Sequence, residues 1–422
     1  MQDLKSRIPP KTLSLLRRIG RLAEGRGEAA YAVGGFVRDL ILGRPGMDID
    51  ITVEGDGLAF AEKLAESTGS QVEAFTRFGT SIVVIPGFGK LDVATARTES
   101  YERPGALPSV RKGGILQDLY RRDFTLNAMA LTLSPGFFLR LLDPFGGMAD
   151  LKRGRIRALH DRSFMDDPTR IFRAVRFEQR FGKRIEPRTR RWLLASVRGD
   201  FLKKVSGERI RSELRLIFQE PRPQKAVLRL GQWGVLPHVH PGLGVTRASK
   251  KALPYIQGTL DFFRKNGTAL EEERMVWFQG LLALPDEARA RDLSRRLMLS
   301  RVERKIVEQS AKAFPAVYGR MGKRGAKLSL IHGLLSPLRP EVQCFLTAAA
   351  PPALRAALKR YFREMKSTIP WIRGRDLQAA GIPPGFRYSF ILLEALNAQL
   401  DGKFKNRREA LKWVGKSFAP EG

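Results

Sequence analysis

Two aspartates, Asp48 and Asp50, stand two residues apart in a short segment that is otherwise apolar. Side chains alternate along a β-strand, so both carboxylates would project from one face while Ile49 and Ile51 project into a core. Two adjacent carboxylates repel each other, and a divalent cation between them relieves that repulsion. The spacing therefore predicts a pair of metal ligands on a strand over 48–53.

A pair of glycines, Gly34 and Gly35, lies just upstream of these aspartates. Glycine lets the backbone approach another group closely, and a short helical pattern over 36–42 follows. The N-terminus of a helix entered through such a turn suits phosphate groups. We expect Arg38 to pair with a triphosphate and Asp39 to brace it. A phosphate site beside metal-binding carboxylates suggests nucleotidyl transfer.

A third carboxylate, Asp92, lies between Leu91 and Val93 in a segment that reads as one strand of a β-hairpin. Phosphoryl chemistry often uses two metal ions, and a carboxylate from a neighbouring strand would complete their ligands. A solvated strand carboxylate is the alternative that the residues alone leave open.

Three polar residues, Arg122, Asp123 and Asn127, interrupt an apolar stretch over 120–130. Their spacing of four predicts that Asp123 and Asn127 lie on one face of a helix. Both side chains can hydrogen-bond the vicinal hydroxyls of a ribose, which would select ribonucleotides over deoxyribonucleotides. The alternative is a helix cap at Asp123 with a buried, satisfied Asn127.

A further helix is predicted over 168–181, with Asp167 as its N-cap and a proline at its first position. Asp167, Arg170 and Arg173 follow one another at spacings of three, so they are nearly aligned along one face. A carboxylate and a guanidinium together offer acceptors and donors that could imitate a Watson–Crick edge and read a nucleobase. A surface Asp–Arg pair is the alternative.

These side chains need a small α/β framework to position them. Strands are predicted over 31–33, 48–53, 81–85, 90–94 and 129–133, with a helix over 58–67. After about residue 150 the strand signals stop, and helical periods broken by Pro and Gly continue to the end. The pattern predicts an α+β fold, a small α/β head followed by an all-α part, with joints near 220–224 and 347–352.

The strongest global signal is the net charge of +32 over 422 residues. Counted along the sequence, residues 221–422 carry a net +20 and residues 1–220 carry +12. Such an excess indicates a polyanionic partner, nucleic acid first, with strongly salt-dependent binding. The single cysteine excludes an internal disulfide, and no apolar run is long enough to span a membrane, so we expect a cytoplasmic protein.

The motifs, taken in order, resemble the class II tRNA nucleotidyltransferase family, which contains the CCA-adding enzymes and the bacterial poly(A) polymerases. The strong resemblance covers roughly residues 30–215, and a weaker one covers 374–411. The motifs that carry it are Gly-Gly-Phe-Val-Arg-Asp39, Asp48-Ile-Asp50, Arg121-Arg-Asp-Phe-Thr-Leu-Asn-Ala128, Leu142-Asp-Pro-Phe-Gly-Gly147, Asp166-Asp-Pro-Thr-Arg170 and Ser206-Gly-Glu-Arg-Ile210.

The resemblance implies a catalytic nucleotidyltransferase head over 1–150, a helical neck over 151–224, a helical body over 225–350 and a tRNA-binding tail over 351–422. It implies Mg²⁺-dependent, template-independent addition of nucleotides from ATP and CTP to the 3′ end of tRNA, whose acceptor arm and elbow the helical half would hold. It assigns metal binding to Asp48 and Asp50, with Asp92 as a further catalytic candidate. Nucleotide contacts fall on Gly34, Gly35, Arg38, Arg122, Asp123, Asn127, Asp167 and Arg170, with Arg173 and Arg176 nearby. In the tail, we expect tRNA contacts from Lys403, Lys405, Arg407 and Arg408.

Two departures from the family pattern bear on which nucleotide is added. The base-reading motif begins Asp166-Asp167 where Glu-Asp is usual, and the segment 101–108 reads Tyr-Glu-Arg-Pro-Gly-Ala-Leu-Pro where CCA-adding members often carry Asp-x-Arg-Arg-Pro. The sequence of the segment 101–108 favours a family member that adds only the terminal A over one that adds all of CCA. A poly(A) polymerase and a catalytically silent RNA-binding protein on the same scaffold are the remaining alternatives.

Overall fold

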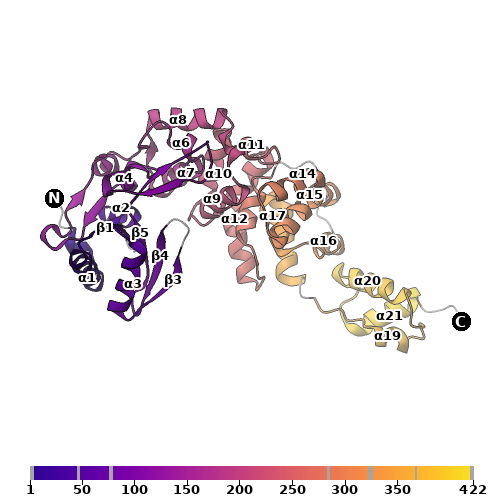
Figure 1. The fold of residues 1–422 in the computed structure, drawn as a ribbon. Coiled ribbons are helices and arrows are strands. Elements are labelled where there is room, and N and C mark those ends of the chain that lie inside the picture. The colour runs from indigo at the N-terminus through magenta and orange to yellow at the C-terminus, as the bar shows by residue number, and fades with distance from the viewer. Residues whose placement is uncertain are drawn as a thin grey trace. The chain divides into compact units, whose positions relative to one another are not determined.

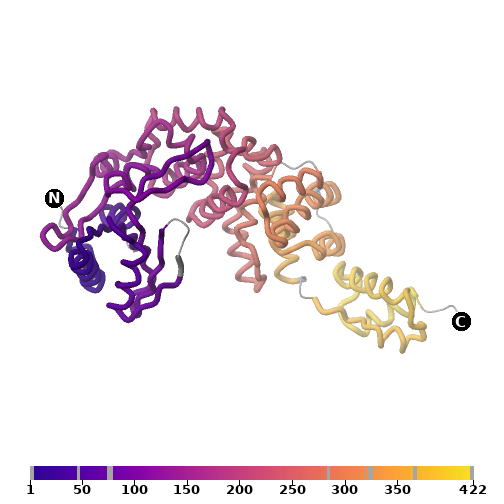
Figure 2. The backbone as a smooth tube through the Cα atoms, in the orientation of Figure 1, coloured from indigo at the N-terminus to yellow at the C-terminus, as the bar shows by residue number. Residues whose placement is uncertain are grey.

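The computed structural model describes residues 4–44, 48–75, 79–282, 286–321, 327–365 and 368–418. The chain divides into two compact units, Met1–Glu213 and Leu214–Gly422, and each unit is described by itself. Figures 1 and 2 show a mixed α/β arrangement in the first unit and helices throughout the second. The α+β prediction is confirmed. The division into head, neck, body and tail stays a prediction.

A seven-stranded sheet in the order β3-β4-β5-β2-β1-β8-β9 forms the centre of the first unit. β2 runs parallel to β5, and the other neighbours are antiparallel. The five predicted strands are all present, whereas the sequence did not predict the two edge strands. The strands of this sheet are β1 (Ala29–Val33), β2 (Ile49–Glu54), β3 (Gln71–Phe75), β4 (Thr80–Ile85), β5 (Gly89–Thr95), β8 (Ala130–Thr132) and β9 (Leu141–Leu142).

The alternation of side chains along β2 gives the sheet an apolar face and a polar face. Ile49, Ile51 and Val53 are almost completely buried. Helices α1 (Pro10–Gly25) and α3 (Gly57–Thr68) pack on the sheet. A Cβ at Gly20 of α1 would stand 1.8 Å from a backbone oxygen of residue 133, so only glycine allows this close approach. The packing leaves Asp50 on the face opposite the apolar one.

The rest of the first unit carries the cavity described below. A small hairpin, β6 (Arg97–Ser100) and β7 (Ser109–Lys112), leads into α4 (Ile115–Tyr120). The remaining elements are η1 (Lys5–Arg7), α2 (Gly35–Ile41), η2 (Thr125–Asn127), η3 (Pro135–Phe137), α5 (Gly147–Lys152), α6 (Ser163–Asp166), α7 (Arg170–Phe181), α8 (Pro187–Arg198) and η4 (Phe201–Lys204). The division between the two units falls within α9 (Gly207–Phe218).

One expectation about the region after residue 150 is wrong. Strands β10 (Arg155–Ile156) and β11 (Arg184–Ile185) pair in parallel and form a second small sheet. Each has only two residues, which is too short to produce a periodic pattern in the sequence.

The elements described in the second unit are all helices. After α9, they are α10 (Pro223–Gln232), α11 (Val235–Val239), α12 (Arg247–Lys265), α13 (Arg274–Gln279), α14 (Glu287–Arg296), α15 (Arg301–Met321), α16 (Leu328–Leu335), α17 (Pro340–Ala349), α18 (Pro352–Arg360), the π-helix η5 (Tyr361–Met365), α19 (Gly374–Ala379), α20 (Arg387–Leu400) and α21 (Arg407–Phe418). The predicted joint at 220–224 overlaps the first residues of α10, and the one at 347–352 overlaps the end of α17 and the first residue of α18, so both joints stay predictions. Within the described ranges, none of the helices is both long enough and apolar enough to cross a membrane.

Candidate functional site

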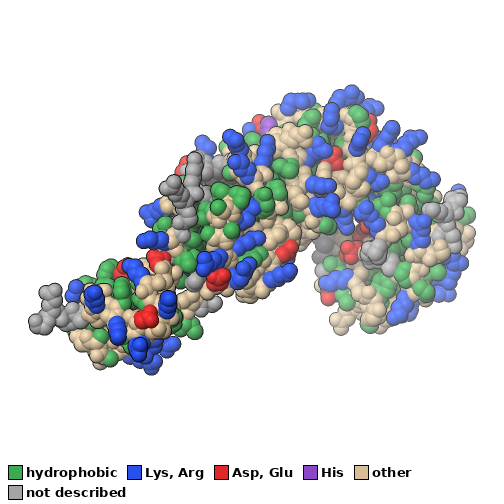
Figure 3. All heavy atoms as spheres, turned by 180° about the vertical axis from the view of Figure 1, so that it is seen from behind, with side chains coloured by type: hydrophobic (Ala, Val, Ile, Leu, Met, Phe, Trp, Pro, Cys, Tyr) green, Lys and Arg blue, Asp and Glu red, His purple; other side chains and the backbone are tan. Residues whose placement is uncertain are grey.

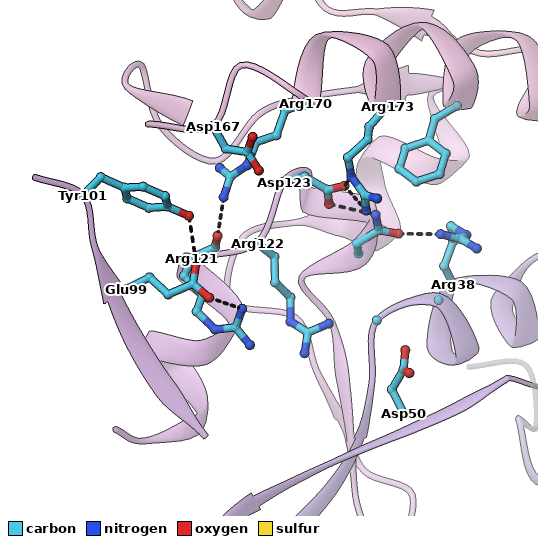
Figure 4. Close-up of a pocket in the computed structure, with 14 residues that line it drawn as sticks. Arg38, Asp50, Glu99, Tyr101, Arg121, Arg122, Asp123, Asp167, Arg170 and Arg173 are labelled. Carbon is cyan, nitrogen blue, oxygen red and sulfur yellow. Dashed lines mark hydrogen bonds and ion pairs between the residues drawn. The ribbon is translucent and has the colours of Figure 1, made fainter. Parts of the chain in front are cut away.

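A cavity of about 430 Å³ in the first unit gathers most of the predicted site residues. Figure 4 shows Asp50 at one end and Asp167 with Arg170 at the other, with Arg122 and Asp123 between them. Five arginines and four carboxylates line it, so its charges nearly balance. The lining residues are Gly34, Gly35, Arg38, Asp50, Glu99, Tyr101, Arg121, Arg122, Asp123, Asn127, Asp167, Arg170, Arg173 and Phe177.

The carboxylates of the head come from the parallel pair of strands. Asp50 of β2 lies opposite Asp92 of β5 in register, so both side chains leave the same face of the sheet. The pKa of Asp50 is raised to about 6, chiefly by burial; Arg122 and Arg38 lower this pKa, and the charges of Asp92 and Asp48 raise it. Burial and the charge of Asp48 also raise the pKa of Asp92. A divalent cation fits this strand face because it would relieve that repulsion.

Only one of these carboxylates lines the cavity itself. Asp48 is exposed just before β2, and neither it nor Asp92 is among the lining residues. Across the described parts of the chain, no three His, Cys, Asp or Glu side chains are arranged closely enough to hold a metal ion. The role of Asp92 as a third ligand therefore stays a prediction.

The glycine pair lies where the backbone meets the site. Gly34 has φ +66°, and α2 begins at the next residue. A Cβ at Gly34 would stand 2.6 Å from Nη1 of Arg122 and 3.5 Å from Oδ2 of Asp50. The backbone conformation therefore favours glycine here, and a side chain at this position would also displace the guanidinium of Arg122.

Arg38 of α2 is more deeply engaged with protein groups than the sequence suggested. It donates to both carboxylate oxygens of Asp39, at 2.9 and 2.7 Å, and to Oδ1 of Asn127 at 2.6 Å. Its guanidinium also lies over the rings of Phe177 and Phe181. Three of its five N–H groups are occupied in this way, which leaves two for a phosphate.

Asp118 is a residue of the site that the sequence reasoning missed. Its side chain on α4 is fully buried and accepts from Arg121, at 3.0 and 2.7 Å, and from Arg122, at 3.3 and 2.9 Å. Burial alone would raise the pKa of Asp118, but the two guanidinium groups lower it overall. An aspartate followed by arginines three and four residues later was the available signal.

Asp123 and Asn127 come together as predicted, but not through an α-helix. Asp123 precedes the 3₁₀ turn η2, and Nδ2 of Asn127 donates to its Oδ1 at 2.8 Å. Its Oδ2 accepts from Arg173 of α7 at 2.8 Å. Burial would raise the pKa of Asp123, yet Arg173 and Asn127 hold it below its usual range. The helix expectation is wrong because Phe124 is extended, and it is the short turn η2 that brings Asn127 back to Asp123.

The end of the cavity beside α7 is formed by Asp167 and Arg170. Helix α7 begins at Arg170, two residues later than predicted, since Asp167 is extended before a proline. Oδ1 of Asp167 accepts from the backbone and hydroxyl of Thr169, and from Arg209 at 2.8 Å. Arg170 donates to Oγ of Ser163 and to the carbonyl of Arg121, both at 2.7 Å. Protein groups therefore hold both side chains in place.

Hairpin residues complete the wall. The sequence links the segment 101–108 to the choice of nucleotide but does not identify Glu99, Tyr101 or Gly105 as site residues. Glu99 of β6 accepts from Arg97, from Arg121 at 2.9 Å and from the hydroxyl of Tyr101 at 2.8 Å. Burial strongly raises the pKa of the Tyr101 hydroxyl. The carbonyl of Gly105 in the same hairpin accepts from Arg209. The contacts of Glu99 with Arg97 and Tyr101 are local, whereas its contact with Arg121 and that of Gly105 with Arg209 join distant segments that no sequence pattern connects.

Two groups of predicted residues lie outside the cavity. Arg176 is buried on α7 and turns towards Glu213, 3.9 Å away. The four tail residues belong to the second unit and are all exposed. Within the tail, Lys403 lies over the ring of Trp413, Arg407 pairs with Asp376, the backbone of Lys405 donates to Glu409, and Arg408 completes the group.

The strand carboxylates, the glycine turn and the helical wall with Asp167 and Arg170 together define a nucleotidyltransferase. Residues 30–157 match the family model described as Poly A polymerase head domain, and residues 183–245 match the model of a probable RNA and SrmB-binding site of polymerase A. The chain belongs to the tRNA nucleotidyltransferase family.

The similarity extends over nearly the whole chain. The A-adding tRNA nucleotidyltransferase of Halalkalibacterium halodurans is 34% identical over 96% of this chain and 92% of that protein. The A-adding enzyme of Geobacter sulfurreducens is 37% identical over 96% of this chain, which spans only about half (47%) of that relative's length. A structure of the Thermotoga maritima CCA-adding enzyme with tRNA superimposes with a TM-score of 0.83 at 33% identity, covering 98% of this chain and 97% of the other.

Proposed function

We propose that this protein adds the terminal A to tRNAs that end in CC, using ATP and Mg²⁺ in a template-independent nucleotidyl transfer. The observation that carries the proposal is a single cavity that runs from the strand carboxylate Asp50 to the base-reading pair Asp167 and Arg170. The relatives from Halalkalibacterium and Geobacter, which match 96% of the chain, are named A-adding enzymes and support the choice of nucleotide.

Asp48 and Asp50 would hold the metal, with Asp92 beside them on β5. Enzymes of this family use a divalent metal ion, and Mg²⁺ suits carboxylate ligands and nucleotide phosphates. When bound, the metal supplies a lowered pKa for the attacking 3′-hydroxyl of the RNA and charge stabilisation for the pyrophosphate leaving group.

Other residues along the cavity would bind the triphosphate and the ribose of the nucleotide. The backbone at Gly34 and Gly35 approaches the triphosphate, and Arg122, between Gly34 and Asp50, pairs with its charge. Asp123 and Asn127 meet the ribose hydroxyls. Arg38, bonded to both Asn127 and Asp39, braces this arrangement and offers its remaining donors to phosphate.

Base selection falls on the remaining wall of the cavity. Three hydrogen bonds meet on Oδ1 of Asp167, so Oδ2 is the oxygen left to accept from an amino group of a base. The guanidinium of Arg170 supplies donors beside it. Arg173, bonded to Asp123, and Arg176, farther along the same helix, support this wall rather than touch the nucleotide.

Arg170→Ala is expected to lower the preference for ATP over CTP, expressed as the ratio of kcat/KM values, by roughly 10- to 100-fold. The reason is the loss of charge-assisted hydrogen bonds to the base, each of which contributes about 1.5–3 kcal/mol. The measurement is steady-state incorporation into CC-ended tRNA with each nucleotide. Arg198→Ala, an exposed arginine on α8, is the charge-matched control. A change in tRNA affinity with unchanged nucleotide preference would show that Arg170 does not read the base.

Addition of all three nucleotides is the second candidate function. It is favoured by the similarity to CCA-adding enzymes whose structures were solved with CTP and with ATP, each with a TM-score of 0.85. A poly(A) polymerase and a silent RNA-binding protein remain as outcomes of the test.

The deciding experiment uses three forms of one tRNA: lacking CCA, lacking CA, and lacking only the final A. The protein is incubated with Mg²⁺ and labelled ATP or CTP. Label from ATP alone, into the CC-ended form alone and stopping after one nucleotide, is the expected result. CTP incorporation into the shorter forms would establish CCA addition, long A-tails would establish a poly(A) polymerase, and no incorporation into any form would overturn nucleotidyl transfer.

The basic surface of the protein supports the proposal that it binds tRNA. Lys and Arg side chains are spread over the face of the molecule seen in Figure 3, as expected of a protein that holds a polyanion. Lys403, Lys405, Arg407 and Arg408 would contribute to tRNA binding through their exposed charges. A tRNA substrate supports the proposal of a cytoplasmic location, where tRNA maturation occurs.

A further inference from the structure

A hollow of about 480 Å³ in the second unit lies between α14 and α15, which are neighbours in Figure 1. Three arginines, one glutamate and one alanine line it. They are Arg291, Arg295 and Ala288 of α14, with Arg304 and Glu308 of α15. This hollow is separate from the cavity of the first unit and shares no residue with it.

Helical spacing explains why these side chains converge. Ala288, Arg291 and Arg295 follow at intervals of three and four, so they share one face of α14. Arg304 and Glu308, four apart, share one face of α15. The opposite sides of both helices are buried through residues such as Leu293 and Ile306. The arginines are therefore presented to solvent across a groove in which one lining residue is as small as alanine.

The carboxylates of the two helices neutralise this group only in part. Between residues 286 and 321 the sequence has five acidic residues; three of them have other partners, and Asp292 is shared between His240 and Arg295. Asp286 accepts from the backbone of Arg289, Glu287 pairs with Lys312, Asp292 accepts from His240 at 2.9 Å and reaches Arg295 only at 3.5 Å, and Glu303 accepts from the backbone of Ser300.

Glu308 is the one carboxylate among the residues that line the hollow, and Asp292 pairs with one of the three arginines, Arg295, at 3.5 Å. In the described part of the chain, neither Arg291 nor Arg304 forms an ion pair, and all three arginines are exposed. Like charges placed close together repel each other, which disfavours the arrangement unless an anion occupies it. A guanidinium has a planar fork of donors that matches phosphate oxygens.

We propose that the hollow between α14 and α15 binds the phosphodiester backbone of the substrate RNA. The inference rests on the proposed function for the identity of the RNA, because a free phosphate would present the same oxygens. The surrounding unit favours a polymer, since its net positive charge extends well beyond the hollow and would attract successive phosphates.

The test replaces Arg291, Arg295 and Arg304 together with glutamine in the full chain. Equilibrium binding of CC-ended tRNA is measured by fluorescence anisotropy over a series of KCl concentrations. Each lost phosphate contact lowers the slope of log Kd against log salt by about 0.7–0.9, so a reduction of about 2 to 3 is expected. At 0.1 M salt, we expect Kd to rise at least roughly tenfold while the KM for ATP stays within about twofold.

A matched control removes the same three charges elsewhere in the unit. Arg247, Lys250 and Lys251 are exposed on α12, and their triple replacement by glutamine changes the net charge equally. A smaller change in slope for this variant supports a specific site. An equal change would overturn the proposal, because net charge alone would then account for the effect. The single variant Arg304→Gln, expected to lower the slope by about 1, provides a readout should the triple variant fail to fold.

Inorganic phosphate separates the two sources of the anion. If the hollow serves RNA, the triple substitution weakens tRNA binding at every phosphate concentration. If it weakens only the binding of inorganic phosphate, an adventitious ion occupies the site and the proposal is wrong. Binding does not require turnover, so a chain that binds RNA with the expected slope but incorporates nothing would contradict the proposed activity and leave the hollow intact.

Discussion

Asp50→Asn is expected to lower kcat for nucleotide incorporation by on the order of 10³-fold or more while tRNA binding and folding are retained. The substitution keeps the shape of the side chain but removes the charge on Asp50, which alone among Asp48, Asp50 and Asp92 lines the cavity. That charge would hold the metal where negative charge develops during transfer. The measurement is single-turnover incorporation of labelled ATP into CC-ended tRNA at saturating Mg²⁺.

The structure also predicts that this variant folds well. Asp50 lies close to Asp92 and Asp48, whose charges raise its pKa together with burial, so an uncharged amide removes repulsion from the metal-free protein. Asp200→Asn, an exposed aspartate of the same unit, is the control for the chemical change. Near-normal kcat in Asp50→Asn would show that the strand pair does not carry the reaction.

Arg173→Ala is expected to lower the free energy of unfolding of the first unit by about 2–4 kcal/mol. The substitution leaves Asp123 deeply buried with only Asn127 and a backbone N–H as partners. Because Arg173 holds the pKa of Asp123 below its usual range, the stabilisation is present above about pH 4 and is lost as the pH falls through the folded value. The difference between parent and variant should therefore narrow as the pH falls from 7 towards 3 in denaturant titrations.

A double-mutant cycle separates this pair from its surroundings. Asp123→Asn combined with Arg173→Met removes both charges, and the combined loss is expected to be smaller than the sum of the two single losses. Lys203→Ala, which removes an exposed pair with Asp200, should change stability by no more than about 0.5 kcal/mol. Additive losses in the cycle would mean that Asp123 and Arg173 do not stabilise each other.

The parts of the site that sequence reasoning located share a local cause. Asp48-Ile-Asp50 and the glycine pair are recognisable because strand alternation and glycine chemistry act over a few residues. Asp167 and Arg170 were found for the same reason, although the helix that carries Arg170 begins later than predicted. The order of these motifs along the sequence then matched that of the nucleotidyltransferase family. This resemblance predicted that their residues belong to one site.

The parts that were missed depend on contacts between distant segments. Glu99 and Tyr101 belong to the site because Glu99, in the hairpin of β6 and β7, accepts hydrogen bonds from Arg121 and Tyr101. The periodicity of the sequence does not predict the contact between the hairpin and Arg121. Arg209 lies more than a hundred residues from Gly105, yet it donates to its carbonyl. The buried Asp118 was within reach of a local argument, since its spacing to two arginines is that of neighbours on a helix.

The near balance of charge within the cavity has a consequence for turnover. The chain as a whole carries +32, yet the cavity is lined by five arginines and four carboxylates, and Asp118 holds two of those arginines from behind. The overall positive charge attracts an RNA strand to the protein, but the nearly balanced charges of the cavity add little electrostatic attraction at the site of the reaction. A finished RNA end can therefore leave the cavity quickly, while the outer surface determines how long the whole molecule stays bound.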